Sequence, residues 1–140
     1  MKIALCQINP TVGAIDQNKD LILNWYQKSI DAGADLVIFP ELAIIGYPPQ
    51  DLLHRQSFIE KAKDALNSIV KNSTVPMIIG NTMKTQTDLY NCSFLCAKGR
   101  IVGDYKKMLL PTYDVFDEDR YFTRGDSPEV YEVEIEGRRR

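Results

Sequence analysis

The sequence predicts an α/β protein whose sheet begins with parallel strands. Strand-like and helix-like segments alternate through 1–80 in the order strand, helix, strand, helix, strand. This order is typical of parallel strands that are joined by right-handed helical crossovers. The segment 36–39 is a short, uninterrupted apolar run, which indicates a strand that is covered on both faces. Two further strand-like segments with a tight turn between them predict an antiparallel hairpin after the parallel strands.

The first elements follow from apolar periodicity and from the residues that start and stop helices. The apolar run 2–8 predicts the first strand. Asp16 is expected to cap a helix that runs to about Ala32, with Ile22 and Trp25 on its apolar stripe.

The later elements are predicted in the same way. The segment 52–71 has the apolar spacing of an amphipathic helix, and 75–80 is the third strand of the parallel set. The segments 89–96 and 100–107 flank a Lys-Gly turn and form the hairpin. Strict alternation of apolar and polar residues over 130–135 predicts a half-buried strand.

Composition excludes several classes of protein. The 140 residues correspond to about one domain, and the net charge of −2 argues against a general nucleic-acid binder. No apolar run approaches the roughly 18 residues that a membrane span needs. The N-terminus lacks the long apolar region of a signal peptide, so we expect a cytoplasmic protein that has no membrane or nucleic-acid partner.

The cysteines and the single histidine do not predict a metal site. Cys92 and Cys96 are expected on one face of a strand, about 13 Å apart at roughly 3.3 Å per residue. This separation is too long for a disulfide or for two ligands of one metal ion. His54 is expected to be solvated, and the third cysteine, Cys6, lies in the first strand.

Glu41 is the first candidate for a chemical role. It follows an apolar strand and Pro40, and ligands of parallel sheets bind beyond the carboxyl ends of the strands. Its apolar neighbours are expected to desolvate the carboxylate, which suits a general base near neutral pH. Gly46 permits a turn with positive φ, and Pro48-Pro49 restrict the backbone behind it. On position alone, a helix cap or a surface ion pair is an equally good interpretation.

Two adjacent lysines in the stretch GDYKKMLLP give the second candidate. Strand alternation places Lys107 on the face of Ile101, which we expect to be covered, and Lys106 on the other face. A lysine on a covered face needs an anionic partner, and Glu41 and Glu118 can supply one. The alternative is a pair of solvated lysines that protect an edge strand from aggregation.

Three stretches together resemble a known family. FPELAIIGYPPQDLL, IIGNT and LYNCSFLCAKGRIVGDYKKMLLPTYDVFDEDRYF are similar to segments of the carbon–nitrogen hydrolase (nitrilase) superfamily. Within it, they most resemble the N-terminal glutaminase domain of glutamine-dependent NAD synthetases. The resemblance implies an αββα sandwich of the nitrilase type. Residues 1–140 are then expected to be an N-terminal fragment of one such domain, incomplete at its C-terminal end.

The resemblance also implies a Glu-Lys-Cys triad. Glu41 matches the general base, Lys107 the lysine that stabilises the oxyanion, and Glu118 a second glutamate that positions the lysine or the substrate amide. Tyr47 and Tyr113 match aromatic residues near the glutamine pocket and the ammonia exit.

The cysteine of that triad has no counterpart in this sequence. In the family it follows the second glutamate by several tens of residues, and none of the three cysteines here does so. The turn-like pair Glu136-Gly137 also lacks a long second arm, which again predicts a fragment. Since the thioester chemistry needs a thiolate, we expect these residues alone to be inactive.

Three hypotheses for function remain open at this stage. The first is glutamine hydrolysis through a glutamyl thioester, which supplies ammonia for NAD synthesis to a synthetase domain of the same polypeptide. This polypeptide is expected to form a homo-oligomer. The glutaminase step needs no cofactor, whereas ATP and magnesium are implied for the synthetase domain. The second is a free amidase or carbamoylase of the same superfamily. The third is a non-catalytic assembly or regulatory domain.

Overall fold

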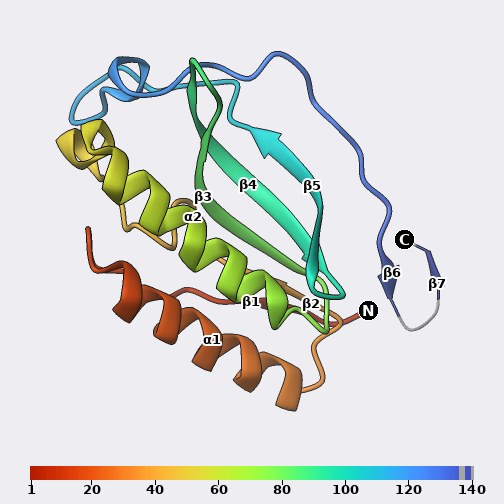
Figure 1. Ribbon diagram of the computed structural model, residues 1–140. Coiled ribbons are helices and arrows are strands. Elements are labelled where there is room, and N and C mark those ends of the chain that lie inside the picture. Colours follow the sequence, from red (N-terminus) through yellow and green to blue (C-terminus); the bar gives the residue numbers. More distant parts are fainter. Residues whose placement is uncertain (136–137, 140) are drawn as a thin grey trace.

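The structure is a computed structural model that describes residues 1–135 and 138–139. A five-stranded sheet in the order β1-β2-β3-β4-β5 carries two long helices side by side on one face (Figure 1). The chain thus supplies one helical layer and one sheet layer of the predicted αββα class. The elements in chain order are β1 (Ile3–Leu5), α1 (Ile15–Asp31), β2 (Leu36–Ile38), the 3₁₀ helix η1 (Gln50–His54), α2 (Gln56–Lys71), β3 (Met77–Lys84), β4 (Leu89–Ala97), β5 (Arg100–Lys106), the 3₁₀ helix η2 (Glu118–Arg120), β6 (Glu134–Ile135) and β7 (Arg138–Arg139).

The strand directions agree with the sequence prediction. β1 pairs with β2 and β2 with β3 in parallel, whereas β3, β4 and β5 pair in antiparallel fashion. The three parallel strands therefore direct their carboxyl ends to one edge of the sheet. The loop after β2, which contains Glu41, starts at this edge.

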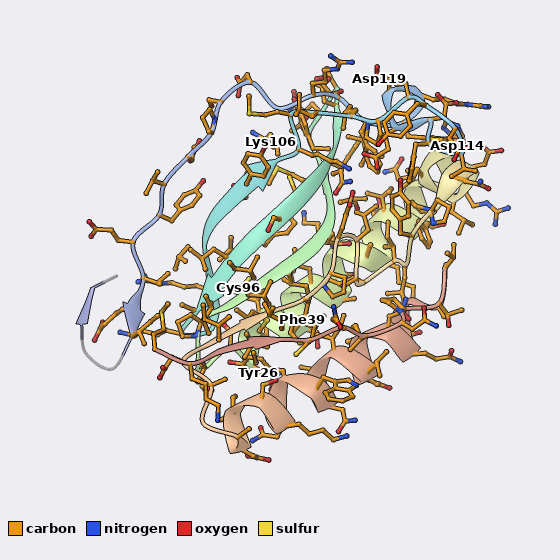
Figure 2. All side chains as sticks on the ribbon, turned by 180° about the vertical axis from the view of Figure 1, so that it is seen from behind. Tyr26, Phe39, Cys96, Lys106, Asp114 and Asp119 are labelled. Atoms are coloured by element: carbon orange, nitrogen blue, oxygen red, sulfur yellow. The ribbon has the colours of Figure 1, made fainter. Side chains whose placement is uncertain are left out.

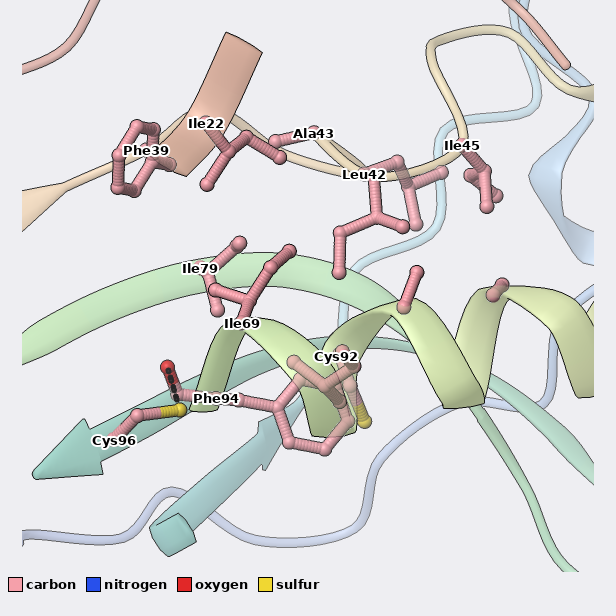
Figure 3. Close-up of a cluster of buried hydrophobic side chains, with 14 of the residues drawn as sticks. Ile22, Phe39, Leu42, Ala43, Ile45, Ile69, Ile79, Cys92, Phe94 and Cys96 are labelled. Atoms are coloured by element: carbon pink, nitrogen blue, oxygen red, sulfur yellow. Dashed lines mark hydrogen bonds between the residues drawn. The ribbon is translucent and has the colours of Figure 1, made fainter. Parts of the chain in front are cut away.

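The hydrophobic core lies between the sheet and the two helices. Ile22 of α1 and Ile69 of α2 are fully buried, and they pack with Ile79 of β3 and Phe94 of β4 (Figure 3). Burial of each such side chain stabilises the fold by roughly 1.5–3 kcal/mol. Leu42 and its apolar neighbours join the same cluster, so the loop that carries the candidate base is anchored in the core.

Two predictions about the first helix are wrong. Trp25 is 42% exposed, and the buried stripe contains Tyr26 instead. The Tyr26 hydroxyl donates to the Val75 carbonyl at 2.6 Å and accepts from the Val75 N–H at 2.9 Å, which satisfies its polar end in the core. Asp16 does not cap the helix, because the N-cap is Ala14. Asp16 lies in the first turn, where an acidic side chain also suits the helix dipole, and pairs with Lys61 of α2 at 2.6 Å.

Two further boundaries differ from prediction. The segment 52–71 is not one helix, because extended backbone at Arg55 separates η1 from α2. Of the predicted strand 130–135, only β6 is a strand. The residues that form the predicted turn, 136–137, lie outside the described residues. No helix in the described part of the chain is long and apolar enough to cross a membrane.

The β4–β5 hairpin contains an irregularity that strict alternation could not anticipate. The register shifts between Leu95 and Cys96, so that Ile101 turns to the helix side and borders a groove beside α2. Lys107 borders a hollow that also contains Glu41. The prediction that Ile101 and Lys107 share a face is therefore wrong, whereas the expected anionic partners of Lys107 are found.

Candidate active site

Local backbone geometry places Glu41 at the edge of the sheet. Leu42 has a φ of 47°, and its carbonyl accepts the N–H groups of Ile45 and Gly46 in a tight turn. The side chains of residues 42–45 are buried in the core, so the turn leaves Glu41 facing out. A non-glycine residue with positive φ stores backbone strain, which is common at functional sites.

Gly80 of β3 lets this loop lie directly against the sheet. A Cβ at Gly80 would stand 2.4 Å from the Leu42 nitrogen and 2.8 Å from the Glu41 Cα, closer than real contacts allow. Only glycine permits this approach. The position of Glu41 therefore depends on a residue almost forty positions further along the chain.

Glu41, Lys107 and Glu118 form one cluster of charges. The Lys107 ammonium donates to Glu41 Oε1 at 2.8 Å and to Glu118 Oε1 at 3.0 Å. Lys107 follows β5 directly, and Glu118 begins η2. The structure thus brings together all three residues that the sequence proposed as catalytic.

The two carboxylates of the cluster differ in environment. The Glu118 side chain is 5% exposed, whereas that of Glu41 is 46% exposed. The expectation that apolar neighbours desolvate Glu41 is wrong, because those neighbours point into the core and the carboxylate points away from them. Glu118 is the buried carboxylate, and a buried charge of this kind needs the cation that Lys107 provides.

The charge of Lys107 is favoured by its partners. Partial burial alone would lower the pKa of Lys107, but the hydrogen bonds to Glu41 and Glu118 outweigh it and raise the pKa above 10.5. The lysine is therefore a permanent cation near neutral pH. A fixed positive charge is the feature that stabilises a developing oxyanion.

The two aromatic residues that the sequence predicted, Tyr47 and Tyr113, differ in their relation to this cluster. The Tyr47 hydroxyl donates to Glu118 Oε1 at 2.9 Å. Burial and this hydrogen bond raise the pKa of Tyr47 well above its usual value, so the hydroxyl stays protonated. Tyr113 is 69% exposed, and its ring contacts Phe116, which in turn contacts the Tyr47 ring.

The cluster borders a hollow of about 300 Å³, at the small end of the range for ligand sites. Figure 2, viewed from the side opposite to that of Figure 1, shows Lys106 at the end of β5 and Asp114 and Asp119 in the segment that follows it. A larger groove of about 870 Å³ lies beside α2, but neither Glu41 nor Lys107 lines it. The smaller hollow is the better candidate because the charged cluster faces it.

Three residues of the site were missed by sequence reasoning. Asn91 donates to the carboxylate of Glu41, Gly80 admits the loop, and Phe116 joins the two tyrosines. A glycine and an asparagine within strand-like segments are unusual, since both residues are depleted in strands. That signal is present in the sequence, but it does not show which partner each residue serves.

None of the three cysteine thiols is suited to attack a substrate here. Cys92 borders the hollow, but its thiol is buried beside Phe94 (Figure 3), and burial raises its pKa to about 12. Burial likewise raises the pKa of Cys96 to about 12. Cys6 is buried with its sulfur 3.4 Å from the Ser29 hydroxyl of α1. Since the thiolate is the nucleophile, buried neutral thiols are inert.

The remaining predictions concern metal ions and His54. Within residues 1–135 and 138–139, no group of three His, Cys, Asp or Glu side chains could hold a metal ion. The His54 side chain is 59% exposed, as predicted, and its ring contacts Tyr121. Neither feature contributes to the charged cluster.

The fold and the charged cluster agree with one family, the carbon–nitrogen hydrolases. The family model described as carbon-nitrogen hydrolase matches residues 2–136, and the chain belongs to this family. Among curated proteins, it is 39% identical to a glutamine-dependent NAD(+) synthetase of Synechocystis over 138 residues, which is 92% of this chain and 25% of that protein. The corresponding protein of Aquifex aeolicus is 38% identical, over 95% of this chain and 24% of its own length.

Solved structures give the same result for the fold. A glutamine-dependent NAD+ synthetase from Acinetobacter baumannii, in complex with ADP, superposes with a TM-score of 0.88 at 33% identity, over 98% of this chain and 26% of that one. An amidase from Nesterenkonia sp. superposes with a TM-score of 0.81 at 24% identity, over 99% and 53% of the two chains, and so supports the fold alone. The chain spans about a quarter of the length of the curated relatives it matches.

Proposed function

We propose that this chain forms part of a glutamine-hydrolysing site whose ammonia is used for NAD synthesis. The observation that carries the proposal is the shared ammonium of Lys107, which holds the exposed carboxylate of Glu41 and the buried carboxylate of Glu118 at hydrogen-bond distance. The names of the two curated relatives described above, both glutamine-dependent NAD(+) synthetases, support glutamine as the amide.

In the proposed reaction, Glu41 takes a proton from a thiol that this chain does not contribute. The thiolate attacks the amide carbon, and the charge that develops on the amide oxygen is stabilised by Lys107. The amide C–N bond then breaks, and ammonia leaves with the proton returned by Glu41. Water, deprotonated in turn by Glu41, hydrolyses the glutamyl thioester to glutamate and restores the thiol.

The other residues are proposed to orient the reacting groups. Glu118 holds Lys107 from its buried side, and Tyr47 fixes the second lone pair of Glu118 Oε1. Tyr113 is proposed to contact the substrate, which its exposure permits. The glutaminase step uses no cofactor, and the ATP and magnesium that NAD synthesis needs belong to a synthetase domain.

The test is glutamine turnover by the full gene product that contains residues 1–140. Glu41→Gln removes the base and is expected to lower kcat by about 10²–10⁴-fold. Lys107→Met removes the oxyanion cation and is expected to lower it by about 10²–10³-fold. Lys106→Met is the matched control, because Lys106 lies beside Tyr90, outside the cluster, and should keep wild-type turnover.

The same assay separates the competing functions. NAD formation from added ammonia should survive both cluster variants if only the glutaminase step is lost. Hydrolysis of other small amides without glutamine turnover would indicate a free amidase or carbamoylase. The absence of any amide hydrolysis would indicate a non-catalytic domain. A polypeptide of residues 1–140 alone should release no glutamate, because its thiols are buried.

A further inference from the structure

Asn91 touches all three charged residues of the cluster. Its side-chain amide donates to Glu41 Oε1 at 2.5 Å and more weakly to Glu118 Oε2 at 3.5 Å. Its main-chain carbonyl accepts the N–H of Lys107 at 2.8 Å. Asn91 is itself 3% exposed and lies on β4, which is paired with β3 on one side and β5 on the other, so its own position is fixed.

We propose that Asn91 is a positioning residue, which fixes the Glu41 carboxylate against Lys107 and selects the oxygen that accepts the proton. Within the described residues, the Glu41 carboxylate has two hydrogen-bond donors, the Lys107 ammonium and the Asn91 amide, and both reach Oε1. No donor among residues 1–135 and 138–139 is bonded to Oε2, so we infer that this oxygen accepts the proton.

The physical need for such a residue follows from exposure. Glu41 is 46% exposed and stands on a flexible side chain, so one ion pair with a lysine is a weak constraint. A second donor on a rigid strand fixes the carboxylate because two anchors restrict its rotation. A charge-assisted hydrogen bond of this kind is also stronger than one between neutral groups.

The cluster also needs a neutral donor for reasons of charge. Two carboxylates share one ammonium, so the cluster carries a net charge of −1 when all three groups are ionised. An amide adds a hydrogen-bond donor without adding a counterion, which leaves Lys107 able to turn its charge toward a substrate oxygen. Leucine has nearly the same shape as asparagine but no N–H, so Asn91→Leu isolates this contribution.

The first experiment measures the pKa of Lys107 in the 140-residue chain, and it does not depend on the proposed function. Carbon-13 NMR of Cε-labelled lysine, with the resonance assigned by Lys107→Met, follows the titration. In Asn91→Leu, Glu41 is expected to leave the lysine, so the pKa of Lys107 falls toward 10.5. An unchanged or higher pKa overturns the proposal, because Glu41 then holds its place without the amide.

Asn81→Leu is the matched control. Asn81 is also a fully buried asparagine within a strand, but its amide donates to the Ala62 carbonyl of α2 and not to the cluster. It should leave the pKa of Lys107 as in the wild type, while thermal melts by circular dichroism report any general loss of stability. If Asn91→Leu prevents folding, Asn91→Ser replaces it, because the serine hydroxyl is too short to reach Glu41.

The second experiment rests on the proposed function and uses the full gene product. Asn91→Leu is expected to lower kcat for glutamine by about 10–100-fold, the range for losing a hydrogen bond to a charged group. KM should change little, since a positioning residue does not contact substrate. A wild-type kcat overturns the role of Asn91 in turnover. A wild type that does not hydrolyse glutamine refutes the proposed function, and the Lys107 titration still decides the role of Asn91.

Discussion

Gly80→Ala gives the sharpest structural perturbation of the loop that carries Glu41. The added Cβ would lie 2.4 Å from the Leu42 nitrogen, and ordinary contact begins at 3.4 Å, so the loop has to move by about 1 Å. Both sides of the contact are backbone, and neither can rotate away. Overpacking of this kind costs about 1–3 kcal/mol, and we expect the upper end of that range.

The unfolded chain offsets part of this cost. Replacement of glycine by alanine reduces the entropy of the unfolded state, which stabilises the protein by about 0.4–1 kcal/mol. The net loss expected for Gly80→Ala is therefore about 2 kcal/mol. In the full gene product, a shift of about 1 Å in Glu41 should also lower glutamine turnover by about 100-fold.

Urea unfolding of the chain measures the first effect, with Gly33→Ala as the control. Gly33 has a φ of +77° and open space around it, so alanine there introduces backbone strain without a clash and far from the cluster. The free energy of unfolding of Gly33→Ala should fall by about 1 kcal/mol or less after the same entropic offset, and the full gene product should keep its glutamine turnover. A Gly80→Ala protein as stable as the wild type within about 0.5 kcal/mol would refute the packing argument.

Three further predictions concern individual side chains in or near the site. Tyr47→Phe removes the hydrogen bond to Glu118 and should lower the free energy of unfolding by about 1.5 kcal/mol in urea titrations at neutral pH; no change would show that water replaces the hydroxyl. Lys107 and Tyr47 both have raised pKa values, so the unfolded chain loses their protons first, and stability should fall as pH rises above 10.0–10.5. In the double variant Tyr47→Phe/Lys107→Met, the urea midpoint should fall less steeply with pH in this alkaline range than in the wild type. An equal pH dependence in the two proteins would contradict the prediction. Cys92 and Cys96 should resist iodoacetamide near pH 8 in the folded chain and react in urea, as followed by mass spectrometry; rapid alkylation of the folded chain would contradict their burial.

Sequence reasoning recovered the parts of the fold that depend on local patterns. The alternation of apolar runs and amphipathic segments predicted the parallel strands and the hairpin, because burial against a sheet imposes these periods. The turn after Glu41 was also anticipated, since Gly46 does adopt a positive φ, 76°. Trp25 was misplaced because the buried stripe runs from Ile22 to Tyr26, four residues on, and not to Trp25, three residues on.

The site was predicted less completely, for a physical reason. Glu41 and Lys107 could be named because each stands at the end of a strand beside recognisable motifs. The role of Asn91 depends on the register of β4 beside β3 and β5, which no local pattern specifies. Likewise, the exposure of Glu41 depends on the turn at Leu42, which directs its neighbours inward and the carboxylate outward.

The central claim is that one ammonium is shared by Glu41 and Glu118. It is tested most directly by the pKa of Lys107 in the wild type, in Glu41→Gln, in Glu118→Gln and in the double variant, measured by carbon-13 NMR. The account predicts a wild-type pKa above 10.5, a lower value in each single variant, and a value below 10.5 in the double variant, where burial alone remains. A wild-type pKa of 10.5 that neither glutamine variant changes would contradict it.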